Sequence, residues 1–179
     1  MTAHPRAAQL GPAIRRAAYR AFYRLPPRWR RRLVRLGTPG YTLGAVVLVH
    51  DADAPAPGRL LLLRQPPGPG WSIPGGLLNR GERPIACAAR ELAEETGLRV
   101  PPEQLRPGVP NAIVHIGGRW IDLVFHASVD ADSVLDLDHA EVHEAAWYPL
   151  DALPQLNRAT ARLLGHYGIG PLADRPEDD

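Results

Sequence analysis

The 179-residue sequence contains one cysteine, Cys87, and no lysine. A single thiol cannot form a disulfide within the chain, so a disulfide-stabilised scaffold is excluded and we expect a reducing, cytoplasmic compartment. No apolar run approaches the roughly 20 residues that a membrane-spanning helix needs. The first residues also lack the continuous apolar stretch of a secretory signal, so we expect no export. The apolar content of 45% is enough for the core of one globular domain.

Acidic residues are absent from the first 36 positions, which hold ten of the 21 basic residues, all of them arginine. The remaining 143 positions hold eleven arginines against 19 acidic residues, which gives a formal net charge of −8. This asymmetry divides the chain into a basic arm over residues 1–36, a domain over residues 37–170 and an acidic tail over residues 171–179. We expect the tail to be disordered.

The arm has the pattern of an amphipathic helix that ends at Pro26 and Pro27, followed by a short basic turn over residues 29–36. Such a helix can pack on its own domain or on a second subunit, which would make a homodimer. It also suits an anionic membrane surface or a nucleic-acid backbone. Disorder is the third alternative. The apolar residues at helical spacing are Ile14, Ala18, Ala21, Phe22 and Leu25.

After the arm the sequence alternates between strand and helix patterns. The runs "YTLGAVVLVH" and "RLLLLRQ" predict two strands joined by a turn, and "GPGWSIPGGLL" predicts a bend before an extended segment near Leu77. Further on, "AIVHIGGRWIDLVFHASV" predicts a hairpin around Gly117 and Gly118. Asp122 and His126 lie on one face of its second strand, which can line a substrate cleft. A C-terminal helix is predicted over residues 157–167.

Between these strands, residues 84–96 predict a helix. Pro84 suits the first helical turn and Gly97 suits the C-cap, while Ile85, Ala88 and Leu92 form an apolar stripe.

Three glutamates, Glu91, Glu94 and Glu95, stand in i, i+3, i+4 relation beside that stripe. Carboxylates at this spacing repel one another unless a cation lies between them, and Mg²⁺ prefers oxygen ligands. The cluster therefore predicts a metal platform, with Arg90 placed to orient a glutamate. A solvated acidic helix end is the alternative.

The sequence from Gly76 to Leu98 resembles the Nudix box, GX5EX7REUXEEXGU with U aliphatic, at every position. A chance match to its seven fixed identities has a probability below about 10⁻⁸ per starting position. Trp71-Ser72-Ile73-Pro74-Gly75 also resembles the usual entry to the box. The resemblance extends over residues 38–166 and implies an α/β fold: an α/β/α sandwich with a mixed β-sheet, to which the arginine-rich helical arm is added.

The resemblance further implies a role for each residue of the box. Glu91 and Glu95 would be the principal ligands of Mg²⁺ or Mn²⁺, supported by Glu94 and the Gly75 carbonyl. Arg90 and Glu82 would orient this shell, while Gly76 and Gly97 would shape the backbone. Water would then attack one phosphorus of a diphosphate.

The general base is less defined, because family members take it from the box or from a later loop. We favour Glu141, with Glu144 as its rival, since a base must reach the attacking water. His139 and His143 could form a zinc pair only on a helix, and no third ligand is evident.

Three further side chains have a functional and a structural interpretation. Arg64 can meet a substrate phosphate or simply face solvent at a strand end. Trp71 can stack on a base or sugar of the substrate or pack in the core. Cys87 is expected to be a small buried side chain, since nearby anions discourage a reactive thiolate.

The substrate itself is not specified by the box. Pro107 and Pro110 lie downstream of it, but not in the register of known subgroup motifs. The first hypothesis is hydrolysis of a nucleoside diphosphate linked to another moiety, such as ADP-ribose or a nucleotide sugar. Alternatives are a nucleoside triphosphate pyrophosphohydrolase and a nucleotide-sensing protein recruited to nucleic acid or membrane by its arm.

Overall fold

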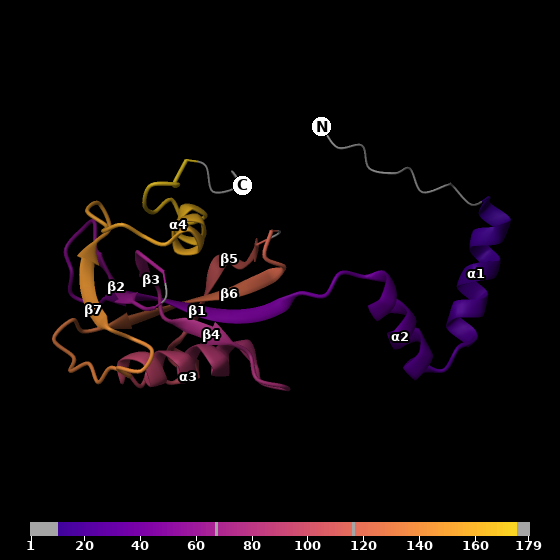
Figure 1. Ribbon diagram of the computed structural model, residues 1–179, viewed down its shortest axis with the longest axis horizontal. Helices are drawn as coiled ribbons and strands as arrows, with labels where there is room; N and C mark the ends of the chain where they lie inside the picture. The colour runs from indigo at the N-terminus through magenta and orange to yellow at the C-terminus, as the bar shows by residue number, and fades with distance from the viewer. Residues whose placement is uncertain (1–10, 67, 116, 175–179) are drawn as a thin grey trace. The chain divides into compact units, whose positions relative to one another are not determined.

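The computed structural model describes residues 11–66, 68–115 and 117–174. The chain separates into two compact units, with the boundary between Gly40 and Tyr41. Figure 1 traces the chain from the helical first unit into the sheet of the second. The first ten residues of the expected arm and residues 175–179 of the expected tail lie outside the described residues.

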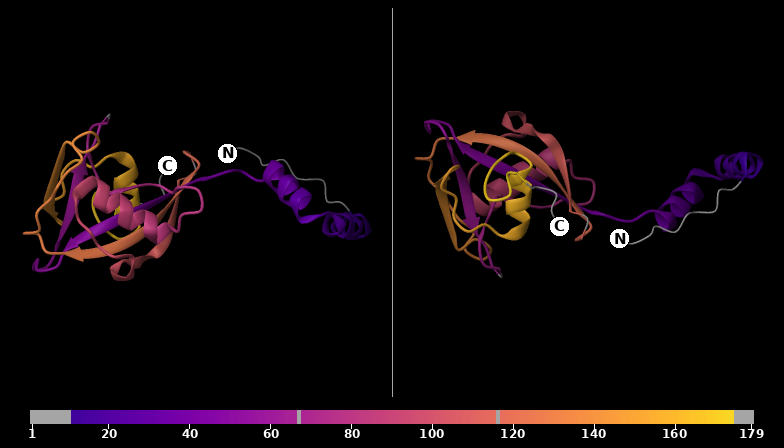
Figure 2. Two further views of the ribbon diagram at one scale, coloured as in Figure 1. Left: turned by 90° about the horizontal axis from the view of Figure 1, so that it is seen from below. Right: turned by 90° about the horizontal axis from the view of Figure 1, so that it is seen from above.

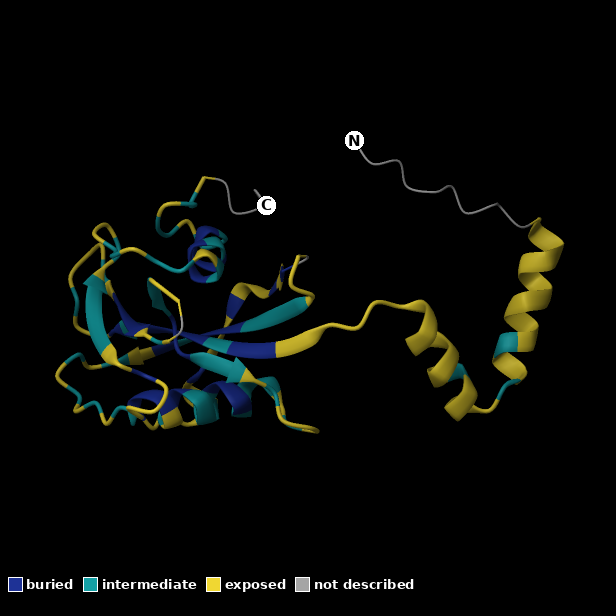
Figure 3. Cartoon of the chain, viewed as in Figure 1, coloured by how far each residue is buried: buried dark blue, intermediate teal, exposed yellow. Residues whose placement is uncertain are grey.

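The first unit consists of two helices, α1 (Pro12–Arg24) and α2 (Pro27–Gly37). Pro26 and Pro27 separate them, as the sequence predicts. The second helix is longer than the predicted turn over residues 29–36, because Pro27 fits the first helical position, where its missing N–H is not needed. Neither helix contains a buried residue, and Figure 3 shows both almost entirely exposed.

The second unit is built on a mixed sheet of seven strands. Its main path has the order β3-β2-β1-β6-β5, while β4 pairs with β1 and β7 pairs with β2. The central pair β1–β6 is parallel and the other pairs are antiparallel. The strands are β1 (Thr42–Asp51), β2 (Arg59–Arg64), β3 (Trp71–Ser72), β4 (Gly75–Leu77), β5 (Arg106–His115), β6 (Trp120–Val129) and β7 (Glu144–Pro149).

Helix α3 (Pro84–Thr96) covers one face of the sheet and helix α4 (Arg158–Gly165) covers the other (Figures 1 and 2). Side chains alternate between the faces along each strand, so each helix packs on its own half of the strand residues. Val47 and Phe125 belong to the core under α3, whereas Leu48 and Val124 belong to the core under α4. The predicted α/β/α sandwich is confirmed.

The helix ends explain where the predictions succeed. Helix α3 has the predicted bounds, because Pro84 begins it and Gly97 ends it with a φ of 76°. Helix α4 begins after its cap Asn157, which accepts a hydrogen bond from the Thr160 N–H. It ends at Gly165, two residues before the predicted end. A short 3-10 turn, η1 (Pro102–Gln104), links α3 to β5.

No helix in the described part of the chain is both long enough and apolar enough to cross a membrane.

Candidate active site

Helix α3 presents its three glutamates at three depths. Glu95 is 3% exposed and lies among the buried residues of the helix. Glu91 keeps 14% of its side-chain area exposed, and Glu94 keeps 58%. The carboxylates therefore run from the core under α3 to the solvent, as expected for a cluster beside an apolar stripe.

Glu95 is held by neutral groups. The Gly75 N–H donates to its Oε2 at 2.9 Å and the Gln65 amide donates to its Oε1 at 2.5 Å. The Ser72 hydroxyl in turn donates to Gln65 Oε1 at 2.7 Å, which fixes the orientation of that amide. Burial raises the pKa of Glu95 to about 7, and the negative charges of Glu91 and Glu141 add to the effect. Both oxygens of Glu95 thus accept from neutral donors.

Arg90 connects the other three carboxylates. Its Nε and Nη2 donate to the two oxygens of Glu82 at 2.9 and 3.0 Å, a bidentate pair. Its Nη1 donates to Glu91 and Glu94, each at 2.8 Å. The bonds from Arg90 lower the pKa of Glu82 to about 2, and the bonds to Glu82 raise the pKa of Arg90. Arg90 and Glu82 therefore orient the exposed side of the cluster.

Gly76 gives the Glu91 carboxylate its place against β4. A Cβ atom on residue 76 would lie 2.3 Å from the carboxyl carbon of Glu91 and 2.4 and 2.6 Å from its oxygens. Only glycine lets this carboxylate approach the strand so closely.

The arrangement suits a hard divalent cation in the chemistry of its donors. Every side-chain atom of the cluster that could bind a metal is a carboxylate oxygen, which Mg²⁺ prefers; three of the carboxylates share the Arg90 guanidinium and the fourth, Glu95, accepts from neutral donors. As the side chains stand, no three acidic, histidine or cysteine residues among those that the structure describes converge as a metal site would. Arg90 already bonds Glu91 and Glu94. A cation would have to share these two carboxylates with Arg90.

The two candidate bases lie on either side of the start of β7. Glu141 is in the loop before the strand, where its charge contributes to the raised pKa of Glu95. Glu144 is the first residue of β7 and pairs with Arg64 at 3.7 Å. Arg64 thus has an exposed carboxylate partner at the strand end, where the sequence left open a substrate phosphate or solvent.

Other residues singled out from the sequence are Trp71, His139, His143 and Cys87. Trp71 packs edge-on against Tyr148, with ring centroids 4.9 Å apart, beside the core under α4. His139 and His143 lie in a turn and a bend, so the helix that a zinc pair requires is absent at this place. Cys87 is buried, as expected, and burial raises the pKa of its thiol to about 11.

A pocket of about 460 Å³ opens beside the glycines of β4. Gly75 and Gly76 belong to its lining, so it adjoins the backbone that holds Glu95 and Glu91. Asp122 also lines it, whereas His126, which was predicted on the same cleft-lining face, is not among the lining residues. The others are Thr42, Gly44, Val46, Leu77, Gly118 and Trp120.

Residues 40–166 match the model of the NUDIX domain, which is more than two thirds of the chain. The chain belongs to the Nudix family. The Nudix box accordingly comprises the end of β4, the following loop, α3 and the two residues after it. This places the acidic cluster and the pocket in one Nudix domain.

Relatives of this Nudix domain are named for several different activities. An RNA pyrophosphohydrolase of Xanthomonas axonopodis pv. citri is 30% identical over 154 residues, covering 73% of this chain and 71% of the relative. The human 8-oxo-dGDP phosphatase NUDT18 is 32% identical over 91 residues, covering 50% of this chain and 27% of the relative. The chain spans about a quarter of the length of the curated relatives that it matches over 91 residues.

A solved structure shares the fold over most of the Nudix domain. The NUDIX domain of Shewanella oneidensis NrtR, complexed with ADP-ribose, superposes with a TM-score of 0.56 at 19% identity, covering 84% of this chain and 95% of that one.

The sequence did not reveal every residue that shapes this Nudix site. Gln65 and Ser72 lie outside the box, and only the fold brings them to Glu95. A polar residue that directly follows an apolar strand, as Gln65 follows "RLLLLR", was the available signal. His115 and Trp120, which bond to Asp122, were likewise not singled out.

Proposed function

We propose that this protein hydrolyses a pyrophosphate bond in a nucleoside diphosphate that is linked to another moiety, with Mg²⁺ or Mn²⁺ as cofactor. The observation that carries the proposal is the buried Glu95, which accepts from two neutral donors, one of them the N–H of Gly75 in the lining of a pocket large enough for a nucleotide. An enzyme needs both features together, whereas a solvated acidic helix end needs neither.

Glu91 and Glu95 would hold the cation, with Glu94 and the Gly75 carbonyl in support. When bound, the metal supplies charge neutralisation on the phosphoryl oxygens and lowers the pKa of a water ligand. Arg90 and Glu82 keep Glu91 and Glu94 in place through the bidentate pair. Gln65 and the Gly75 N–H keep Glu95 in place from the buried side.

Glu141 would accept a proton from the attacking water. A new P–O bond forms from the water, the bridging P–O bond breaks, and two phosphorylated products leave. Glu141 is favoured because its charge reaches Glu95, whereas Glu144 pairs with Arg64 on the strand. Glu141→Gln should therefore lower kcat far more than Glu144→Gln does.

Two alternative functions use the same domain, one with a different substrate and one without catalysis. The relative named as an RNA pyrophosphohydrolase favours a triphosphate substrate, from which the water would release pyrophosphate. A nucleotide sensor would bind without turnover, but such a binding protein has no need for the complete set of box glutamates.

The test is a screen for metal-dependent phosphate release over ADP-ribose, nucleotide sugars, dinucleotides, capped RNA and nucleoside triphosphates. Pyrophosphatase or phosphatase couples each reaction to a phosphate signal. Glu95→Gln is the inactive control, and Glu103→Gln, on the exposed turn η1, is the matched control for loss of one acid. Turnover of one substrate that Glu95→Gln abolishes supports the hydrolase. Binding of nucleotides without turnover across the whole panel would favour the sensor.

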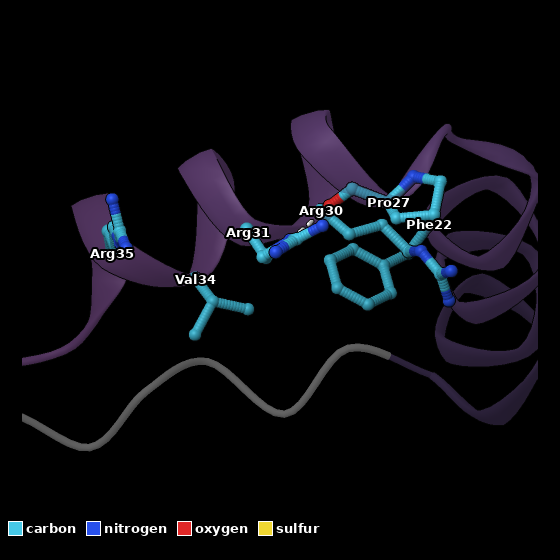
Figure 4. Close-up of a pocket in the computed structure, with 6 residues that line it drawn as sticks. All are labelled: Phe22, Pro27, Arg30, Arg31, Val34 and Arg35. Atoms are coloured by element: carbon cyan, nitrogen blue, oxygen red, sulfur yellow. Dashed lines mark hydrogen bonds between the residues drawn. The ribbon is translucent and has the colours of Figure 1, made fainter. Parts of the chain in front are cut away.

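We further propose that the arm recruits the enzyme to an anionic membrane surface. Helix α2 places Trp29, Leu33 and Leu36 at i, i+4, i+7 on one face, all exposed. Arginines occupy the other face, and the arm contains no acidic residue to neutralise them. Figure 4 shows Phe22 of α1 and Arg30, Arg31 and Val34 of α2 among the residues that line a pocket between the two helices. An apolar face flanked by arginines is the pattern of helices that lie in a lipid interface.

Nucleic-acid binding and packing in a homodimer remain competing outcomes for the arm. The cytoplasmic compartment expected from the single cysteine also stays a prediction.

A further inference from the structure

The pocket beside the Nudix box has one side formed by a single face of two parallel strands. In the register of β1 and β6, Thr42 pairs with Trp120 and Gly44 pairs with Asp122. Alternate residues of paired strands point to the same face, so these four residues share the face that lines the pocket. No residue of α4 is part of the lining, which leaves this end of the face open to a ligand.

Asp122 is oriented by two donors on one oxygen only. His115 Nε2 lies 2.9 Å from Oδ2, and the Trp120 indole N–H donates to the same oxygen at 3.2 Å. Because a carboxylate oxygen only accepts, the histidine nitrogen is the donor. Among the residues that the structure describes, no donor reaches Oδ1. Asp122 therefore has one occupied and one available acceptor.

Glycine next to Asp122 keeps the available oxygen uncovered. A Cβ atom on Gly44, the β1 partner of Asp122, would lie 2.6 Å from Oδ1. The absence of that side chain leaves space above the oxygen on the pocket face.

The donors of Asp122 are themselves fixed. The His115 ring stacks on the Trp120 ring, with centroids 4.5 Å apart and planes 19° apart. A Cβ atom on Gly118 would lie 1.5 Å from the Trp120 ring, so glycine in the β5–β6 turn is what admits the indole. Asp122 is thus held in one orientation before any ligand arrives, which is the condition for selective hydrogen bonding.

The pocket also adjoins the proposed reaction centre. Gly44 pairs with Leu77 of β4 on its other side, and Gly76 and Gly75 follow along the same strand pair. Two strand spacings, on the order of 10 Å, separate the β6 and β4 backbones. A nucleotide whose phosphates lie at Gly75 and Gly76 can therefore place its base at Asp122.

We infer that Asp122 selects a nucleobase that carries an exocyclic amino group, through a hydrogen bond donated to its free Oδ1. This inference rests on the proposed function for the location of the phosphates. A carboxylate oxygen attracts an amino group and repels a carbonyl oxygen at the same place, and a site built for a donor rejects ligands that lack it. Guanine and cytosine are therefore favoured over hypoxanthine and uracil.

The experiment measures binding of GMP, IMP, CMP and UMP to the full chain by titration calorimetry in the presence of Mg²⁺. These monophosphates contain no anhydride bond, so binding is read independently of hydrolysis. GMP differs from IMP only by the amino group, and we expect GMP to bind at least about tenfold more tightly, with the same order for CMP over UMP. Equal dissociation constants within both pairs, or no binding of any of the four, would overturn the inference even if a substrate is hydrolysed.

Two variants assign the preference to Asp122. In Asp122→Asn the amide oxygen can accept from His115 and Trp120, which turns the NH₂ toward the pocket and should reverse both preferences. Gly44→Ala covers Oδ1 without a change of charge and should abolish them. Asp132→Asn, on an exposed loop residue, makes the same change of charge outside the pocket and should leave both preferences intact. A preference that survives Asp122→Asn and Gly44→Ala, each shown folded by its melting temperature, would contradict the role of Asp122.

Discussion

The acidic cluster at α3 and the basic arm both concentrate charge of one sign, but only the acidic cluster contains a residue of the opposite charge. At α3, Glu91 and Glu94 share Arg90 with Glu82 of the preceding loop, and Glu95 is buried against neutral donors. In α1 and α2 every arginine except Arg30 is classed as exposed, and the arm has no acidic residue of its own. The negative charge at the site is thus partly balanced by an arginine of the same domain, whereas the positive charge of the arm has no acidic residue within the arm to balance it.

The largest effect should follow from removing the buried charge at the site. Glu95→Gln keeps the shape of the side chain but removes a cation ligand, and its single amide oxygen can accept from only one of Gly75 and Gln65. We expect kcat to fall between about 10²- and 10⁴-fold with the substrate found in the screen. The fold should remain intact, since burial already disfavours the ionised form of Glu95. Full metal-dependent activity in this variant would show that the buried glutamate is structural only.

Removing positive charge from the arm should weaken binding of the protein to an anionic membrane without changing its rate of hydrolysis. Arg28→Gln, Arg32→Gln and Arg35→Gln together remove three of the five arginines of α2. At about 1 kcal/mol for each arginine near an anionic surface, binding to vesicles with phosphatidylserine should weaken about 10²-fold. Flotation of the protein with such vesicles, at low and high salt, measures this change, while hydrolysis stays at the level of the unchanged protein.

Arg83→Gln, Arg106→Gln and Arg158→Gln provide the matched control, because they remove three exposed arginines from the second unit. Equal loss of vesicle binding in both triple variants would show that the total charge of the protein, and not the arm, determines membrane binding. Loss of a dimer in sedimentation, without any vesicle binding, would instead favour subunit packing. Salt-sensitive binding to nucleic acid alone would favour that partner.

A smaller effect should come from the backbone that supports the cluster. In Gly76→Ala the new methyl group meets the Glu91 carboxylate at 2.3 Å, so that carboxylate must move away from β4. We expect the Mg²⁺ concentration for half-maximal activity to rise about 10- to 100-fold, as for other changes that displace metal ligands. Gly68→Ala, where nothing lies within 4 Å of the added atom, should leave this concentration unchanged. An unchanged metal requirement in Gly76→Ala would remove Glu91 from the ligand set.

The two regions also show what a sequence can and cannot predict. The bounds of α3 follow from local chemistry, because Pro84 and Gly97 act on the backbone wherever the helix lies. The depth order of its glutamates follows from their angle to the apolar stripe. The contacts of Gln65 with Glu95 and of His115 with Asp122 join residues 30 and 7 positions apart on different elements. No local pattern specifies such pairs, since they depend on the sheet register.

The smallest effect concerns the histidine pair His50 and His126, which burial favours in the neutral form. His50 Nε2 lies 2.8 Å from His126 Nδ1, with the rings stacked at 5.1 Å, and the ring of Tyr167 meets His126 edge-on. Burial lowers the pKa of both histidines, and for His50 the neighbouring His126 adds to the effect. In the unfolded chain both would titrate near pH 6.5. The unfolded state therefore binds more protons just below that pH, and stability falls as the pH drops.

We expect the free energy of unfolding to decrease from about pH 7 downward, by at most about 1.4 kcal/mol per pH unit for each histidine that stays neutral in the fold. Urea denaturation between pH 7.5 and 5 measures the slope, which His50→Gln with His126→Gln should reduce. His139→Gln, at an exposed loop position, is the control for loss of one histidine. A slope that the double variant leaves unchanged would place the acid sensitivity elsewhere. Because the pair lies under α4 and the glutamates lie by α3, a reduced slope with unaltered hydrolysis would show that stability and chemistry depend on charges on opposite faces of one sheet.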